Sequence, residues 1–99
     1  MEIKLINHGD NGELLLIGRL DSVTADEAEA VFGQVMDRFT SITLNMESLE
    51  YVSSAGLRVL KRMHMAMNKK GGKLELVKVR PMVMEVFEMT GFASLLRIV

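Results

Sequence analysis

The residues best placed for chemistry are the two serines of "EYVSSAGLRVLKRM", residues 50–63, where an apolar run leads into an amphipathic helical pattern. Backbone N–H groups in the first turn of a helix have no intrahelical partners. Ser53 or Ser54 can therefore cap the helix, and Gly56 lets another segment approach this turn closely. The same free N–H groups and the helix dipole favour an anion, so a phosphate on such a hydroxyl would be held without refolding the helix. The sequence leaves both roles open.

Basic side chains follow the serines on the same predicted helix. Arg58 lies one turn after Ser54, where its side chain can reach back toward the hydroxyl. The face opposite the apolar stripe carries four basic residues and a methionine: Arg58, Lys61, Arg62, Lys69 and Met65. Such a face is either solvated charge or a docking surface for an acidic partner, with Met65 as an adaptable apolar contact.

Other chemistry has little support. The chain has no G-x-x-x-x-G-K-[ST] phosphate loop, and no G-x-S-x-G motif surrounds the serines. His8 and His64 lack the spacing of a metal site or of a base for Ser54, and we interpret both as surface residues. The acidic pairs Asp26-Glu27 and Glu85/Glu88 are typical of solvated helix faces. We therefore predict no enzyme activity, no catalytic residue, no metal and no cofactor.

The composition is that of an ordinary globular chain, and 99 residues suffice for one domain with a single core. Hydrophobic residues make up 48% and charged residues 25%. The formal net charge is -1, so no overall field recruits nucleic acid or an anionic membrane. Cysteine is absent, which excludes disulfides and thiol chemistry. No signal peptide or apolar run of roughly 20 residues is present, so we expect a cytoplasmic protein without membrane insertion.

Hydrophobic patterning predicts the strands that position the serines. The runs "IKLI" and "ELLLIGRL", separated by the turn-forming "NHGDNG", predict a β-hairpin. Further strands are expected at "SITLNM", "KLELVKV" and, at the end of the chain, "LLRIV". The segment "SLEYVSS" is interpreted as the loop that leads into the serine turn.

Three helices are predicted between these strands, over residues 25–39, 54–70 and 81–90. A T-x-x-E capping box of Thr24 and Glu27 would start the first helix. Gly71-Gly72 would end the second and Gly91 the third, because glycine takes the left-handed cap conformation without a Cβ clash.

The third helix begins at Pro81, a favourable first helical position, and its apolar residues are expected to face inward: Met82, Val83, Val86, Phe87 and Met89. The element order is then ββαβαβαβ. Strands that alternate with helices require crossover connections, which give parallel pairing. The sequence thus predicts a single α/β domain over residues 1–99. Its mixed, mostly parallel sheet has four to five strands packed with three helices.

Three separated segments resemble one known family. The segments "GRLDSVTADEAEAVF", "ITLNMESLEYVSSAGLRVL" and "RPMVMEVFEMTGFASLLRIV" are similar, in the same order, to the STAS domain of bacterial anti-sigma factor antagonists. The shared features are a G-x-L/I-D strand end, an apolar strand ending in Asp or Asn, a D/S-S-x-G-L turn and a late F-x-x-S/T-G-L segment. The likeness covers nearly the whole chain, although the family's usual last helix has no counterpart after "LRIV".

The resemblance implies a partner-switching regulator. In this family the unphosphorylated antagonist binds a serine kinase that doubles as an anti-sigma factor, the kinase phosphorylates the serine of the turn, and a separate serine phosphatase resets it. The acceptor corresponds to Ser54, preceded here by Ser53 where the family often has Asp. Asp21 and Asn45 match polar positions that lie on the kinase side. With the basic helix face, the expected partner-binding residues are Asp21, Asn45, Ser53, Ser54, Gly56, Arg58, Arg62 and Met65.

The same family resemblance leaves a second function open. STAS domains also serve as accessory subunits of transport or lipid-trafficking complexes, where they bind an ATPase subunit without a phosphorylation cycle. Ser53 in place of Asp and the short end of the chain are compatible with that role.

Overall fold

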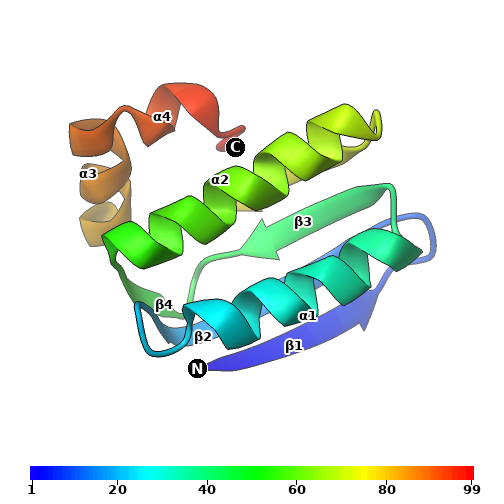
Figure 1. Cartoon of the computed structure of the whole chain (residues 1–99), viewed down its shortest axis with the longest axis horizontal. Helices are drawn as coiled ribbons and strands as arrows, with labels where there is room; N and C mark the ends of the chain where they lie inside the picture. Colours follow the sequence, from blue (N-terminus) through cyan, green and yellow to red (C-terminus); the bar gives the residue numbers. More distant parts are fainter.

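The computed structural model describes all 99 residues as one α/β domain. Figure 1 shows its helices and strands. In chain order these are β1 (Glu2–Asn7), β2 (Gly12–Leu20), α1 (Ala25–Arg38), β3 (Ser41–Asn45), β4 (Leu49–Val52), α2 (Ser54–Lys69), β5 (Lys73–Val77), α3 (Pro81–Thr90) and α4 (Phe92–Leu95).

The strands form one mixed sheet in the order β1-β2-β3-β5, and β4 pairs with the far end of β2. β1 and β2 are antiparallel, as the predicted hairpin requires. The β2–β3, β2–β4 and β3–β5 pairs are all parallel. The prediction of a mostly parallel sheet with one antiparallel hairpin is therefore confirmed.

Helices α1 and α2 lie side by side across one face of the sheet, and α3 stands at one end of the molecule, where it packs against β4 and α4 (Figure 1). Strand residues alternate between this covered face and an open face. Leu14, Leu44 and Leu76 point into the core, together with the predicted apolar stripes of α1 and α2. The core is a single cluster of apolar side chains with no buried polar residue.

The interpretation of "SLEYVSS" as a loop is wrong for its central residues. Leu49–Val52 form β4, whose Leu49, Tyr51 and Val52 pair with residues 18–20 of β2 across an irregular register at Gly18. Leu49 and Val52 are buried, whereas Glu50 and Tyr51 face outward. A strand of four residues with this pattern shows no alternation that distinguishes it from a loop.

The last predicted strand, "LLRIV", is also wrong. Phe92–Leu95 form the short helix α4, so the chain has four helices rather than three. Only the final residues approach β5, through an isolated parallel bridge between Leu76 and Ile98. Two backbone hydrogen bonds of 2.9 Å from and to Leu76 hold this tail at the sheet edge.

The third helix buries less of its apolar surface than expected. Val83 and Phe87 are buried and Val86 is half-buried. Met82 and Met89 were expected inside, but they are 73% and 79% exposed. Apolar residues occupy most positions of α3, so its sequence defines no narrow inner stripe, and packing against β4 and α4 selects the buried side.

Candidate functional site

The site is built where two neighbouring parallel strands end. Leu20 of β2 is in register with Val52 of β4, and the Ser53 N–H donates a 3.0 Å hydrogen bond to the Leu20 carbonyl. The residues that follow each strand therefore lie next to each other: Asp21 on one side, and the Ser53-Ser54 pair on the other. Ligand sites of open α/β sheets occur at such carboxyl ends.

The two serines take different roles at the start of α2. Ser53 has extended backbone angles and is the N-cap, and its hydroxyl accepts a 3.4 Å hydrogen bond from the Gly56 N–H. Ser54 is the first helical residue, and its exposed hydroxyl makes no hydrogen bond within the chain. The first turn contains no acidic residue that would repel an added anion. Ser54 thus presents an exposed hydroxyl that has no partner within the chain.

Gly56 fixes the helix against the sheet. A Cβ at this position would lie 2.6 Å from the Leu20 carbonyl oxygen and 2.9 Å from a methyl group of Val52. Real Cβ atoms do not approach a backbone oxygen so closely, so only glycine lets α2 start this near β2. Gly56 is buried, and its role in the structure is packing beneath the serines.

Asp21 and Thr24 stabilise the turn before α1 through reciprocal hydrogen bonds. Its Oδ1 accepts from the N–H groups of Val23 and Thr24, at 2.9 and 3.2 Å, and the Thr24 hydroxyl accepts from the Asp21 N–H at 3.0 Å. The predicted capping box of Thr24 and Glu27 is wrong, because the Thr24 side chain makes no bond to the helix. The reciprocal bonds instead join Asp21 and Thr24, in the D-x-x-T pattern of the turn that precedes Ala25.

These hydrogen bonds also favour the ionised form of the Asp21 carboxyl. The Val23 N–H, followed by the Thr24 donors and nearby Arg19, lowers the pKa of the Asp21 carboxyl below its ordinary value. Arg19 approaches the other carboxylate oxygen at 3.6 Å and stacks over the Tyr51 ring, 4.3 Å from its centroid. Sequence reasoning missed Arg19 and Tyr51, because they become cross-strand neighbours only if residues 49–52 form a strand.

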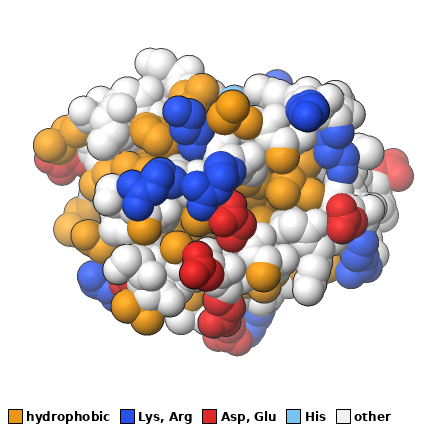
Figure 2. Space-filling view, in the orientation of Figure 1, with side chains coloured by type: hydrophobic (Ala, Val, Ile, Leu, Met, Phe, Trp, Pro, Cys, Tyr) orange, Lys and Arg blue, Asp and Glu red, His pale blue; other side chains and the backbone are white.

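The basic face of α2 continues from Ser54 along the outside of the molecule (Figure 2). Arg58 is exposed and forms no ion pair, and Met65 is 56% exposed. Arg62 differs, because its Nε and Nη2 donate to the two carboxylate oxygens of Glu29 on α1 at 2.5 and 3.0 Å. This bidentate contact raises the pKa of Arg62 and lowers that of Glu29. Arg62 is therefore already paired, whereas Arg58 is free.

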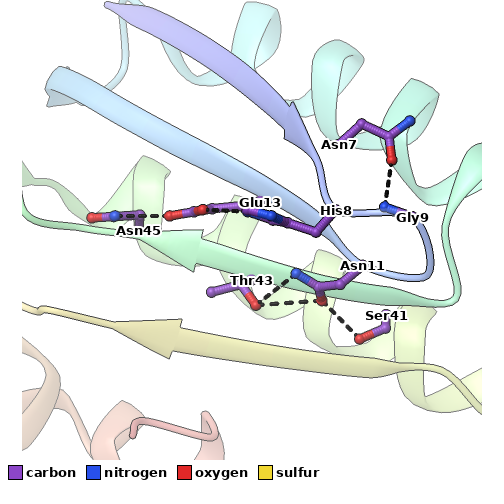
Figure 3. Close-up of polar contacts among 8 residues, drawn as sticks. All are labelled: Asn7, His8, Gly9, Asn11, Glu13, Ser41, Thr43 and Asn45. Carbon is purple, nitrogen blue, oxygen red and sulfur yellow. Dashed lines mark hydrogen bonds and ion pairs between the residues drawn. The ribbon is translucent and has the colours of Figure 1, made fainter.

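Asn45 does not join this cluster. It is in register with Leu15, six residues before Asp21 on β2, a separation of up to about 20 Å along a strand. Its side chain lies on the open face of the sheet, where Nδ2 donates a 2.9 Å hydrogen bond to Glu13 (Figure 3). β3 ends at Asn45, opposite Leu15 of β2, whereas β2 continues to Leu20 and pairs there with β4. Asn45 and Asp21 therefore lie at different positions along the strand direction.

Glu13 and Asn45 belong to a polar network on that open face. His8 Nε2 lies 2.8 Å from the other carboxylate oxygen of Glu13 (Figure 3). The Asn45 hydrogen bond and then the His8 contact lower the pKa of Glu13. Asn11, just before β2, bonds to Ser41 and Thr43 of β3. The polar side chains of this face thus satisfy one another.

The histidines and acids form no further reactive group around the serines. His8 contacts Glu13, and His64 contacts Asn68 at 3.1 Å, so neither ring is placed as a base beside Ser54. No group of three or more histidine or acidic side chains has the geometry to bind a metal ion. None of the helices is both long and apolar enough to span a bilayer.

Comparison with known proteins assigns the family. The sequence profile of the STAS domain matches residues 2–99. The chain belongs to the STAS domain family. The resemblance carried by the three quoted segments is therefore confirmed over nearly the whole chain.

Relatives of this STAS domain include proteins named for one regulatory role. BtrV of Bordetella bronchiseptica, a candidate anti-sigma factor antagonist, is 36% identical over 81 residues, which cover 81% of this chain and 70% of BtrV. An anti-sigma factor antagonist from Mycobacterium paratuberculosis has the same fold, with a TM-score of 0.87 at 20% identity, over 98% of this chain and 83% of that chain. The phosphorylated form of Bacillus SpoIIAA superposes with a TM-score of 0.75 at 19% identity, over 99% and 91% of the two chains.

Proposed function

We propose that this STAS domain is an anti-sigma factor antagonist that switches partners through phosphorylation of Ser54. Unphosphorylated, it binds a serine kinase that also acts as an anti-sigma factor, and a separate serine phosphatase restores the bound form. The observation that carries the proposal is the exposed, unbonded Ser54 hydroxyl at the first position of α2. Family membership and the names of BtrV and SpoIIAA support it.

Ser54 is a better acceptor than its neighbour. The Ser53 hydroxyl is half-buried and engaged with the Gly56 N–H, so a phosphate there would displace the helix cap. A phosphate on Ser54 keeps this cap and lies at the positive end of the helix dipole. Arg58, one turn later and without another ion pair, can approach it. The family's frequent Asp before the acceptor is replaced by Ser53, whose hydroxyl caps the helix instead.

The expected effect of phosphorylation is loss of docking rather than refolding. The phosphate adds about -1.5 to -2 charges. Near a helix N-terminus such a charge is worth about 1 to 2 kcal/mol, whereas moving a two-state fold from 1:99 to 99:1 requires about 5.5 kcal/mol. Burying the same charge in an interface costs considerably more, and each 1.4 kcal/mol, roughly, lowers affinity tenfold. Phosphorylation therefore acts on the complex.

The docking surface we propose surrounds Ser54. It comprises the Asp21 turn, on which Val23 is 87% exposed, and the outer face of α2 with Arg58 and Met65. Ser53 and Gly56 hold Ser54 in place from beneath, and Arg62 lies at the border, paired with Glu29. A complementary partner has acidic side chains opposite Arg58 and an apolar contact for Val23 or Met65.

The experiment is capture of partners by the tagged protein in its own cells, followed by mass spectrometry of the captured proteins. We expect the wild type and Ser54→Ala to capture a serine kinase and Ser54→Asp to lose it. Thr40→Asp is the matched control, because Thr40 is also exposed but precedes β3, at the opposite edge of the parallel strands. Thr40→Asp should therefore capture the kinase as the wild type does.

The same capture separates the two functions of the family. If the wild type and all three variants capture the same transport ATPase, the domain is an accessory subunit and the switch is excluded. A serine kinase captured equally by Ser54→Asp and by the wild type would show that Ser54 lies outside the interface.

A further inference from the structure

Helix α3 presents an unusual outer stripe. Met82, Glu85 and Met89 are spaced at i, i+3 and i+7, so they share one side of the helix, and all three are exposed. Met82 and Met89 are among the most exposed large hydrophobic side chains of the molecule. In Figure 2 hydrophobic and acidic side chains lie at the left edge, where Figure 1 places α3. Adaptable methionines on a surface are typical of a docking site.

The charge of this stripe is negative and uncompensated. Glu85 and Glu88 form no ion pair, and α3 contains no basic residue. The acidic side chains therefore flank the two methionines with free charge. A partner that covers this stripe needs basic groups next to an apolar contact.

Helix α2 of the same chain has that chemistry. Arg58, Lys61 and Met65 are spaced at i, i+3 and i+7, and all three are exposed. Neither Arg58 nor Lys61 forms an ion pair, in contrast to Arg62 with its Glu29 contact. The unpaired basic side chains of α2 thus lie beside an exposed methionine, just as the unpaired acidic side chains of α3 do. The two surfaces carry opposite charge.

We infer that the α3 stripe (Met82, Glu85 and Met89), flanked by Glu88, binds the α2 stripe (Arg58, Lys61 and Met65) of a second copy of this chain. The two stripes have equal length, because residues 58–65 and 82–89 each span about 10.5 Å of helix.

With the helices antiparallel, Lys61 faces Glu85 and Arg58 faces Glu88. Met65 then packs against Met82. The opposed helix dipoles favour the same orientation. Because each copy carries both stripes, a pair related by a two-fold axis makes this contact twice.

The association should be weak and sensitive to salt. Exposed ion pairs change an equilibrium by less than about fivefold each, and salt screens them. The methionines add apolar contact, but the stripes are short. Self-association does not depend on the Ser54 switch, although both surfaces include Arg58, so a docked copy and a docked kinase would compete for that part of α2.

Sedimentation equilibrium over a range of protein concentrations tests the inference. The wild type should dimerise at about 0.05 M salt. At about 0.5 M salt the dissociation constant of the dimer should be tenfold or more higher. One variant reverses α2 (Arg58→Glu with Lys61→Glu), and another reverses α3 (Glu85→Lys with Glu88→Lys). Each variant alone should be monomeric, because two stripes of like charge then face each other. Circular dichroism checks that both variants are folded.

Mixing the two reversed variants is the decisive step. Each reversed stripe then meets a complementary one, so the mixture should form a heterodimer that neither variant forms alone. A wild type that stays monomeric at every concentration would contradict the inference. Dimerisation that survives both reversals would contradict it too, and would assign the interface to another surface such as the outer edge of β1. A mixture that remains monomeric would also exclude this pairing.

Discussion

Gly56 of α2 lies against Leu20 of β2 so closely that a Cβ on Gly56 would be 2.6 Å from the Leu20 carbonyl oxygen. The same carbonyl accepts the hydrogen bond of the Ser53 N–H. One backbone oxygen of β2 thus sets both the end of β4 and the start of α2, and thereby the position of Ser54. The geometry of the proposed switch depends on this approach of backbone to backbone.

Replacing Gly56 by alanine should therefore destabilise the domain. The added methyl group meets a backbone oxygen that cannot move without shifting the strand, and overpacking of this kind costs about 1 to 3 kcal/mol. Urea unfolding measures the loss. The matched control is Gly33→Ala in α1, where a Cβ meets nothing within 4 Å. That substitution should instead stabilise the domain by about 0.5 to 1 kcal/mol, since alanine favours the helix interior. Equal effects of the two changes would contradict the contact.

Replacing Ser53 and replacing Ser54 should have different effects on the free energy of unfolding. Ser53→Ala removes the cap of α2 and should lower the free energy of unfolding by about 0.5 to 1 kcal/mol, the lower part of the range for caps because the hydrogen bond is 3.4 Å long. Ser54→Ala removes an exposed hydroxyl without a partner and should change stability by less than about 0.5 kcal/mol. The reverse order in urea unfolding would mean that Ser54 is the cap.

The pKa of Glu13 should depend on Asn45. Asn45 donates to the Glu13 carboxylate and is the largest cause of its lowered pKa. A carboxyl whose folded pKa is depressed contributes stability above its unfolded pKa, and this contribution is lost as the pH falls through the folded pKa. In Asn45→Ala, the NMR titration of Glu13 should therefore move up toward the ordinary value of 4.5. The stability difference from the wild type should be largest above that pH and shrink in acid.

If instead Glu13 titrates at the same pH in both proteins, the Asn45 contact does not hold the charge. His8→Ala is the comparison, because it removes the second side chain that lowers the Glu13 pKa and should raise that pKa as well.

Phosphorylation of Ser54 should leave the fold unchanged. Amide spectra of the phosphoprotein and the wild type should coincide except near residues 50–60 and the adjoining Asp21 turn, because the phosphate adds to an existing helix start. Shifts spread across α1 and the sheet would mean that the modification rearranges the domain, which contradicts a switch that acts only on docking.

Much of the fold follows from local sequence. The structure confirms the periodic stripes of α1 and α2, Pro81 at the first position of α3 and Gly91 at its end, because each depends on the conformation of a few adjacent residues. The hairpin and the parallel pairs follow from the same signals through the connection rules.

The wrong predictions have a common physical cause, which is contact with residues that lie elsewhere in the sequence. Leu49–Val52 become a strand because residues 18–20 of β2 are available beside them, which no local pattern records. The last residues form α4 and a single bridge to Leu76, where the local sequence favoured a strand. Met82 and Met89 are exposed because the sides of α3 that pack on β4 and α4 are those of Val83 and Phe87. Each outcome depends on a neighbour distant in sequence.

The site was predictable to the same extent. The serine turn, its helix and the basic face were recognised from adjacent residues, whereas the sequence left the cap open between Ser53 and Ser54. The separation of Asn45 from Asp21 follows from the stagger between β3 and β4, which the sequence did not show. The T-x-x-E pattern predicts a capping box, but Thr24 bonds instead to Asp21 in the preceding turn, through the D-x-x-T pattern.

The central claim is that Ser54 is phosphorylated in the living cell. It is tested most directly by phosphopeptide mass spectrometry on the protein isolated from its own cells under growth and stress conditions, with a phosphatase-treated sample as control. We predict a single phosphate on Ser54 whose occupancy changes between conditions, which disappears in Ser54→Ala and persists in Ser53→Ala. A chain that is unmodified in every condition, or a phosphate that maps to Ser53, would contradict the account.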